Sequence, residues 1–461
     1  MTQRLVRSIL LVPAAVAVYA FVLHSVYVEV IVVNFAYTGY RYSTPTVYAL
    51  LASWLLASLV AVALPARARS GVSVLLWILF LVVVAPVVLT LPYMGILDDR
   101  DGALFGAGLS IAFLLTVLIS RRRAPAEPLR ASVSPTTFWL IIGGFSAVTY
   151  GYVAFTIGIS LDFLSLFDVY DQRSDYREAL AESTILGYLV SNQANVVNPL
   201  LIAWGVTKRR WPLVIIVIVG QWALYSATGF KTVLFSIAAI ALLLVLFKFD
   251  RRPRLLLMMW GASALVLLAR FVDDLSGSIV LTSIFARRFL FTPARLSSIY
   301  YDWYSNNPLS LLANSILSPF ITSPYEYGPA RTIALHVTGA ADSSLNANVY
   351  AAGYAEFGWV GLIGVGILLG IYLRIVDRAA AGLPAWFSAV VAVMPAITMA
   401  NTSLQTAMLS HGLVAVILTL MLVPRVNAGG PLDPPATSRN GPRSGRHRPD
   451  RAAPHMPLRK K

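Results

Sequence analysis

The chain has 461 residues, of which 57% are hydrophobic and only 12% are charged. A soluble protein of this length carries roughly 25% charged residues, so the composition excludes an ordinary water-soluble fold and predicts a membrane protein. The chain has no cysteine, which excludes disulfide bonds and thiolate metal sites.

Apolar runs long enough to cross a bilayer predict twelve transmembrane helices. The chain begins like a signal peptide, with a basic start before an apolar run, but no small-residue cleavage site ends that run, so we expect an uncleaved first span. The predicted spans are residues 8–30, 46–64, 71–91, 103–120, 136–158, 184–206, 211–227, 231–248, 254–270, 355–374, 384–400 and 404–423.

The basic residues predict the orientation of these spans. With the N-terminus in the cytoplasm, the cytoplasmic segments hold 26 of the 36 Lys and Arg residues but only 5 of the 21 acids. This asymmetry follows the positive-inside rule. The sequence therefore predicts an all-α integral membrane protein with both termini cytoplasmic, and the net charge of +15 does not indicate nucleic-acid binding.

Two domains of unequal size follow from the same division. Residues 1–423 are expected to form a polytopic membrane domain. Residues 424–461 are rich in proline and arginine and have no hydrophobic periodicity, which predicts a disordered basic tail in the cytoplasm. Such a tail can touch anionic lipid headgroups, or it can bind a specific partner.

The first long outer segment is expected at about 159–183. Its acids are spaced three and four residues apart, which places them on one face of a helix. That face is either simply solvated or forms an acidic rim that repels anionic groups near a site.

In the sixth predicted span, Asn192, Asn195 and Asn198 lie three residues apart and are expected to share one face. They either bond neighbouring helices or line a polar groove. Lys231 begins the eighth span, directly after Gly229 and Phe230. Snorkelling explains a lysine there, but a cation at a helix N-terminus also suits an anionic ligand such as a diphosphate.

The second long outer segment, about 271–354, joins the ninth and tenth spans and is rich in aromatic residues and arginine. Aromatic side chains at a membrane surface are belt anchors or stack on sugar rings. Arginines on the predicted outer side run against the positive-inside rule. The planar guanidinium of arginine can bind two phosphate oxygens at once, which makes these arginines candidates for phosphate binding. The glycan-binding candidates here and just beyond are Tyr301, Trp303, Asn346, Asn348 and Tyr354.

Several of these features resemble one family. The twelve spans, the long late outer loop, GFK at the start of a helix, RRFLFTPARL, and N-x-N-x-Y-x-x-G-Y-A-E-F-G-W-x-G before a glycine-rich span are similar to bacterial O-antigen (Wzy-type) polymerases. The similarity is clearest over about 225–375 and is only topological before that.

The resemblance implies a glycosyltransferase at the outer leaflet of a bacterial plasma membrane. It would move a growing glycan from undecaprenyl diphosphate onto another lipid-linked repeat unit, with a flippase and a chain-length regulator as further partners. The leaving group is already a diphosphate, so neither a nucleotide cofactor nor a metal is expected. An acceptor of another kind would make the protein a different lipid-linked glycosyltransferase or a glycan ligase, and a flippase or transporter of lipid-linked glycan is the non-enzymatic alternative.

This chemistry needs cations for the diphosphate and a base for the attacking hydroxyl. The main base candidates are His336 and Glu356, and Asp302 and Glu326 are secondary candidates. Glu356 could instead cap a turn or pair with an arginine. The diphosphate-binding candidates are Lys231, Arg287, Arg288, Arg295 and Arg331.

Overall fold

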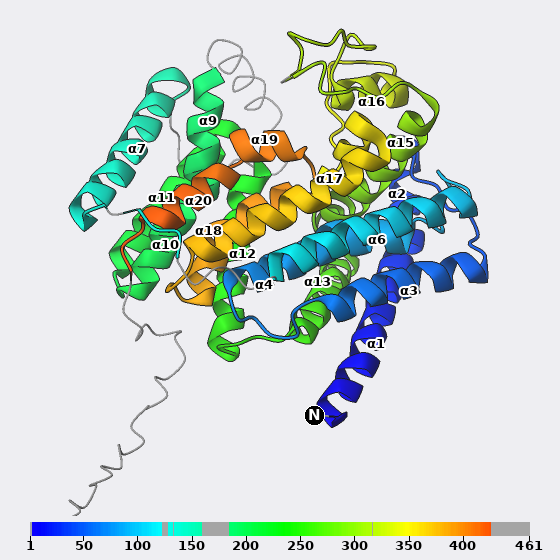
Figure 1. Ribbon diagram of the computed structural model, residues 1–461, viewed down its shortest axis with the longest axis horizontal. Coiled ribbons are helices and arrows are strands. Elements are labelled where there is room, and N and C mark those ends of the chain that lie inside the picture. Colours follow the sequence, from blue (N-terminus) through cyan, green and yellow to red (C-terminus); the bar gives the residue numbers. More distant parts are fainter. Residues whose placement is uncertain (1, 122–127, 132, 159–183, 316, 426–461) are drawn as a thin grey trace, which may run out of the picture.

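The computed structural model describes residues 2–121, 128–131, 133–158, 184–315 and 317–425, and within these ranges the regular structure is helical apart from one isolated bridge between Arg67 and Arg254 (Figure 1). The helices are α1 (Thr2–Val26), η1 (Tyr27–Ile31), α2 (Val32–Phe35), η2 (Ala36–Thr38), α3 (Val47–Ala63), α4 (Gly71–Leu79), η3 (Phe80–Val84), α5 (Ala85–Thr90), α6 (Asp99–Arg121), α7 (Pro135–Thr156), α9 (Thr184–Asn192), η4 (Gln193–Val197), α10 (Asn198–Thr207), α11 (Trp211–Thr228), α12 (Lys231–Phe249), α13 (Leu255–Ser276), α14 (Val280–Thr282), η5 (Ser283–Phe291), α15 (Thr292–Asn306), α16 (Pro329–Thr338), α17 (Val349–Ala379), α18 (Ala385–Thr398), α19 (Leu404–Leu409) and α20 (Leu413–Leu422).

Nine helical stretches in the described ranges are long and apolar enough to cross a membrane, which is compatible with a multi-pass membrane protein. Two further apolar helices, α3 and α18, are shorter, and the sixth predicted span corresponds to α9, η4 and α10 in succession. Twelve spans, and the side that each loop faces, therefore stay predictions. The nine stretches are Leu10–Thr38, Gly71–Thr90, Asp99–Arg121, Pro135–Thr156, Trp211–Thr228, Lys231–Phe249, Leu255–Ser276, Val349–Ala379 and Leu404–Leu422.

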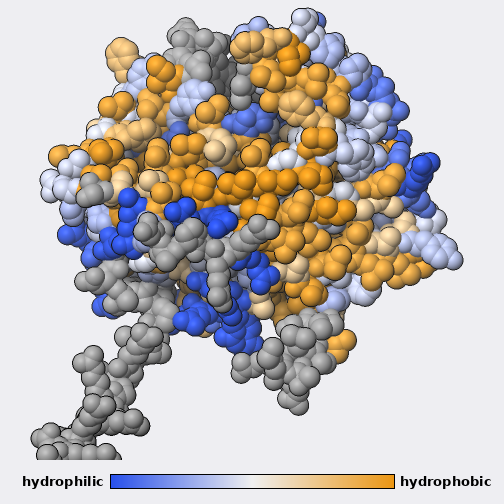
Figure 2. Space-filling view, in the orientation of Figure 1, coloured by the Kyte–Doolittle hydropathy of each residue, from blue (hydrophilic) through white to orange (hydrophobic). Residues whose placement is uncertain are grey.

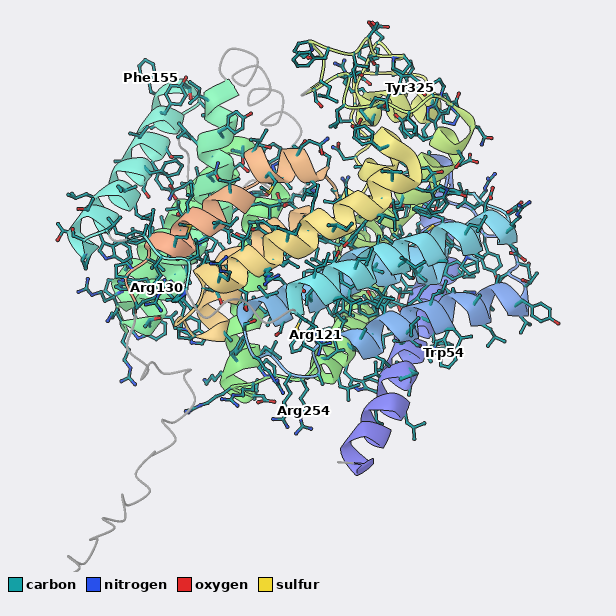
Figure 3. All side chains as sticks on the ribbon, viewed as in Figure 1. Trp54, Arg121, Arg130, Phe155, Arg254 and Tyr325 are labelled. Atoms are coloured by element: carbon teal, nitrogen blue, oxygen red, sulfur yellow. The ribbon has the colours of Figure 1, made fainter. Side chains whose placement is uncertain are left out.

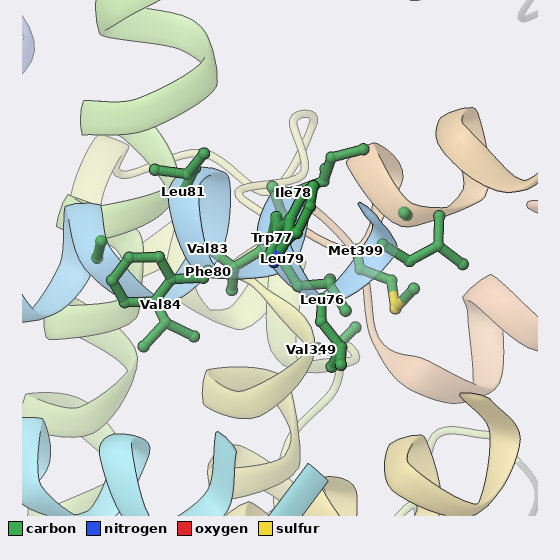
Figure 4. Close-up of a cluster of buried hydrophobic side chains, with 14 of the residues drawn as sticks. Leu76, Trp77, Ile78, Leu79, Phe80, Leu81, Val83, Val84, Val349 and Met399 are labelled. Atoms are coloured by element: carbon green, nitrogen blue, oxygen red, sulfur yellow. The ribbon is translucent and has the colours of Figure 1, made fainter. Parts of the chain in front are cut away.

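The stretch Gly71–Thr90 forms the centre of the bundle. It is the most apolar of the nine and 94% of its most apolar window is buried, as expected of a helix that is hydrophobic on every side. Trp77 and Phe80 are fully buried there, in a cluster that also contains Val349 and Met399 (Figure 4). The Val349 amide donates to the Met399 carbonyl at 3.0 Å, so the start of α17 is attached beside this core.

Helices α6 and α17 lie side by side along much of their length (Figure 1). Their approach depends on small residues, because a Cβ atom on Gly366 would overlap the Ala112 carbonyl and one on Gly370 would crowd Ile119. The Thr116 hydroxyl lies 2.9 Å from both the Gly366 carbonyl and the Tyr350 hydroxyl, which satisfies a polar group inside the apolar contact.

A buried amide network joins α10, η4, α11 and α12. The Asn198 amide nitrogen donates to the Gln221 side-chain oxygen at 2.5 Å, and Gln221 in turn donates to the Ser236 hydroxyl at 2.7 Å. Of the three predicted asparagines only Asn198 bridges to other helices, whereas Asn192 and Asn195 bond within their own turn. The segment between them is π-helical, so a spacing of three no longer keeps one face.

The charged and apolar surfaces are separated. Arg254 lies toward the lower side of the view with Arg121 above it, Arg130 lies at the left at mid-height, and Tyr325 lies among the loops at the upper end (Figure 3). Apolar side chains cover most of the middle of the visible face (Figure 2). The predicted acidic face at 168–182 and the predicted tail beyond residue 425 lie outside the described residues.

Candidate functional site

A cavity of about 320 Å³ lies between α12, η5, the start of α15 and the loop before α17. We call it the cation cavity. Lys231 is the first residue of α12, and the left-handed Gly229 (φ 63°) that ends α11 reverses the chain just before it. Arg288 reaches the same cavity from η5, fifty-seven residues further along the chain. Its lining residues are Lys231, Thr232, Phe235, Ile284, Arg288, Phe289, Thr292, Leu296, Ser344, Leu345, Asn346 and Asn401.

The two neighbouring arginines of η5 have different surroundings. The Arg287 guanidinium lies 4.1 Å from the centre of the Phe35 ring, and its Nε donates to the Ser283 hydroxyl at 3.0 Å. Arg288 is exposed and lines the cation cavity. The structure therefore brings Arg288, and not Arg287, together with Lys231 and Asn346.

A second cavity of about 470 Å³ lies between the loop after α2, α15 and α16. We call it the histidine cavity. Arg295 is fixed on its wall, because its Nε donates to the Gly39 carbonyl at 3.2 Å and its guanidinium lies 5.3 Å from the centre of the Tyr40 ring. The lining residues are Ala36, Gly39, Tyr40, Arg41, Ile96, Arg295, Ile299, Asp302, His336 and Val337.

Asp302 and His336 are the acid–base candidates of the histidine cavity. The His336 ring is held against the Trp303 ring, with their centres 4.3 Å apart. Partial burial raises the pKa of the Asp302 carboxyl above its usual range, the nearby Asp101 carboxylate adds to this effect, and His336 and Arg41 only partly offset it.

Helix α15 separates the two cavities. Thr292 and Leu296 are four residues apart and line the cation cavity, whereas Arg295 and Ile299, also four apart, line the histidine cavity. The Thr292 hydroxyl lies 2.8 Å from the Tyr40 hydroxyl, so one hydrogen bond joins the two walls. Six of the predicted residues are thus divided between two adjacent cavities: Lys231, Arg288 and Asn346 line the first, and Arg295, Asp302 and His336 line the second.

Glu356 lines neither cavity. Directly after it, α17 kinks at Phe357 and Gly358, and Gly358 adopts φ 58° and ψ −140°, which is open to glycine and very few other residues. The kink frees the carbonyls of Ala355 and Glu356, which accept the amides of Ser310 and Leu311 at 3.0 and 3.1 Å.

The Glu356 carboxylate completes the same contact. It is 7% exposed and accepts the Leu312 amide at 2.6 Å. Leu311 and Leu312 both have positive φ values, 51° and 55°, which strain residues with side chains. The geometry gives Glu356 a turn-holding position, the capping alternative of the sequence analysis, and catalysis by Glu356 stays an untested prediction.

The predicted glycan-binding residues are also dispersed. Asn346 lines the cation cavity, but Asn348 is fully buried, where it caps α17 and donates to the Ser297 hydroxyl at 2.6 Å. Tyr301 and Tyr354 are 5% and 4% exposed, and their ring centres are 5.1 Å apart. Trp303 is half-buried under His336.

Arg331 lies on α16 and lines neither cavity. Its Nε donates to the Ala341 carbonyl at 2.8 Å, and its guanidinium lies 4.5 Å from the centre of the Tyr327 ring. Two residues that sequence reasoning missed do line a cavity: Arg41, in the loop between η2 and α3, and Asn401, after α18. Arg41, the arginine of NFAYTGYRYSTP, could have been selected from the sequence because it lies on the predicted outer side, as the other candidate arginines do. No comparable sequence feature points to Asn401.

No three His, Asp or Glu side chains in the part of the chain that the structure describes come together as a metal-binding group. Comparison of the chain with protein-family models, with curated proteins and with solved structures finds no match.

Proposed function

We propose that the protein is a membrane glycosyltransferase that polymerises undecaprenyl-diphosphate-linked oligosaccharide repeat units at the outer face of a bacterial plasma membrane. The observation that carries this proposal is the cation cavity, where Lys231 and Arg288 meet the amides of Asn346 and Asn401. A diphosphate needs such cations. Sugar hydroxyls can form hydrogen bonds with the amides, and the apolar face of a sugar ring can stack on Phe289.

The cation cavity is suited to the donor headgroup. Lys231 and Arg288 supply the positive charge, and the N-terminus of α12 adds to it through the helix dipole. As the bond between the donor sugar and the diphosphate breaks, negative charge grows on the leaving diphosphate. Fixed cations stabilise that charge more than they stabilise the ground state, which lowers the barrier.

The histidine cavity is suited to the acceptor. In the proposed reaction a hydroxyl oxygen of the acceptor sugar attacks the anomeric carbon of the donor sugar and forms the new glycosidic bond. The diphosphate leaves with the bonding electron pair, and the hydroxyl proton passes to His336. Asp302 lines the same cavity and stabilises the imidazolium that results. The Tyr40–Thr292 hydrogen bond lies between the two cavities, and in the proposed reaction it opens so that the acceptor hydroxyl reaches the anomeric carbon.

The proposal is tested by the length of the surface glycan. A strain with the gene deleted is complemented with the wild-type chain, with Lys231→Ala, with Arg288→Ala and with Lys248→Ala. Lys248 is the matched control, because it is exposed at the far end of the same helix as Lys231. All four proteins are checked for equal abundance in the membrane.

We expect wild type and Lys248→Ala to restore long chains, and the two cavity variants to leave single repeat units. Removal of one fixed charge from a site of this kind costs about 10²- to 10³-fold in rate. Long chains of normal length in both cavity variants would overturn the site assignment. Repeat units that collect on the cytoplasmic leaflet in the deletion strain would favour a flippase, and long chains that fail only to reach their final attachment point would favour a ligase.

A further inference from the structure

An apolar groove of about 190 Å³ adjoins the cation cavity. It is formed chiefly by α12, α13 and η5, and includes Leu242 and Leu265. The groove and the cavity share Thr232, Phe235 and Phe289, so the two spaces are neighbours along the same side chains.

The lining of the groove offers almost no hydrogen-bonding groups. Tyr19 and Thr232 are its only residues with polar side chains, and the Tyr19 hydroxyl already donates to the Leu81 carbonyl at 2.9 Å. A sugar placed there would leave its hydroxyls without partners, which is costly. A hydrocarbon chain has no such requirement.

The groove opens beside exposed apolar side chains of α12 and α13. Helix α12 packs chiefly on α11 and α18, whereas α13 packs chiefly on α1, so these two consecutive helices are separated. Leu242 is 56% exposed at the edge of the groove. It lies eleven residues after Lys231, which is about 16 Å along a helix and about half of a hydrocarbon core that is ~30 Å thick.

The continuity of the two spaces indicates what fits. An occupant that is anionic in the cation cavity and apolar in the groove matches both linings, and a lipid with an anionic headgroup has this composition. A helix of a partner protein would not account for Lys231 and Arg288 beside the end of the groove.

We propose that the groove between α12 and α13 binds the hydrocarbon chain of a polyprenyl diphosphate whose headgroup occupies the cation cavity. The lipid enters laterally from the membrane, with its diphosphate beside Lys231 and Arg288 and its first isoprene units along Phe235 and Leu242. This inference rests on the proposed function for the identity of the headgroup.

The test uses the full chain in nanodiscs of phosphatidylcholine, with two probes that share the diphosphate: undecaprenyl diphosphate and inorganic diphosphate, which has no hydrocarbon chain. Ala238→Phe places a ring inside the groove, and Ala241→Phe is the control, because Ala241 is exposed on the same helix but does not line the groove. Binding is measured by native mass spectrometry.

We expect Ala238→Phe to weaken undecaprenyl diphosphate binding at least tenfold and to leave inorganic diphosphate binding unchanged, which also shows that the cation cavity is intact. Ala241→Phe should bind both probes as wild type does. The groove assignment would be overturned if Ala238→Phe left undecaprenyl diphosphate binding unchanged. It would also be overturned if phosphatidylglycerol competed with undecaprenyl diphosphate as effectively as unlabelled undecaprenyl diphosphate does.

Failure of the proposed function has a different signature. If undecaprenyl diphosphate binds and Ala238→Phe weakens it, but no glycan is transferred, then the groove assignment holds and the polymerase proposal fails. If the wild-type chain does not bind undecaprenyl diphosphate, both are overturned.

Discussion

Replacement of Glu356 by alanine should loosen the turn at residues 310–312. The Glu356 carboxylate accepts the Leu312 amide at 2.6 Å and is 7% exposed, so water cannot readily replace it. Glutamine keeps an oxygen acceptor at the same position, whereas alanine removes the acceptor. The two variants therefore separate a turn-holding role from a catalytic one.

The magnitude follows from the contact that is lost. A buried amide without a partner costs about 1–3 kcal/mol. The positive φ values of Leu311 and Leu312 store further strain that opening releases. A loss of about 2 kcal/mol raises the opened fraction of the turn roughly 30-fold.

The assay is hydrogen exchange of the peptide that contains Leu311 and Leu312, with the chain in nanodiscs. We expect Glu356→Ala to exchange roughly 30-fold faster than wild type and Glu356→Gln to exchange nearly as wild type does, with glycan polymerisation retained. Wild-type exchange in Glu356→Ala would refute the structural reasoning. A Glu356→Gln variant with normal exchange but no polymerisation would instead identify Glu356 as a catalytic base.

Three further predictions concern other parts of the molecule. Gly358→Ala should destabilise the protein by about 1–3 kcal/mol, because φ 58° and ψ −140° are strained for alanine; a thermal midpoint in detergent equal to that of wild type would contradict this. Gln221→Leu should cost about 1–3 kcal/mol, since Asn198 and Ser236 each lose one buried partner, and unchanged thermal unfolding would exclude a stabilising network. Asp302→Asn should slow polymerisation, because a neutral amide cannot stabilise the imidazolium of His336; a wild-type rate in this variant would exclude Asp302 from the site.

The helices could be predicted from the sequence because apolar length alone identifies a membrane-crossing segment. Every predicted span falls on helical structure, although the structure describes nine stretches of sufficient length and hydropathy in its ranges. The grouping of asparagines could not be predicted, because an α-helical spacing was assumed where Gln193–Val197 is π-helical.

The candidate site could be predicted only in part. Their predicted outer-side position identifies Lys231, Arg288 and Asn346 as candidates, but their meeting in one cavity depends on how η5 and the loop before α17 pack against α12. The sequence also could not show that Arg288 lines the cavity and Arg287 does not. The angle between neighbouring side chains depends on the type of helix, and Ser283–Phe291 is π-helical. The partner of Glu356 depends on the kink at Gly358, whose direction no local pattern specifies.

The most direct measurement is glycan transfer by the purified chain. Lipid-linked repeat units that accumulate in the deletion strain are incubated with the wild-type protein in nanodiscs, and products and released lipid are quantified together. The account predicts a ladder with steps of one repeat unit and one undecaprenyl diphosphate released for each bond formed, both absent with Arg288→Ala. Repeat units that remain single in the presence of folded wild-type protein that binds undecaprenyl diphosphate would contradict it.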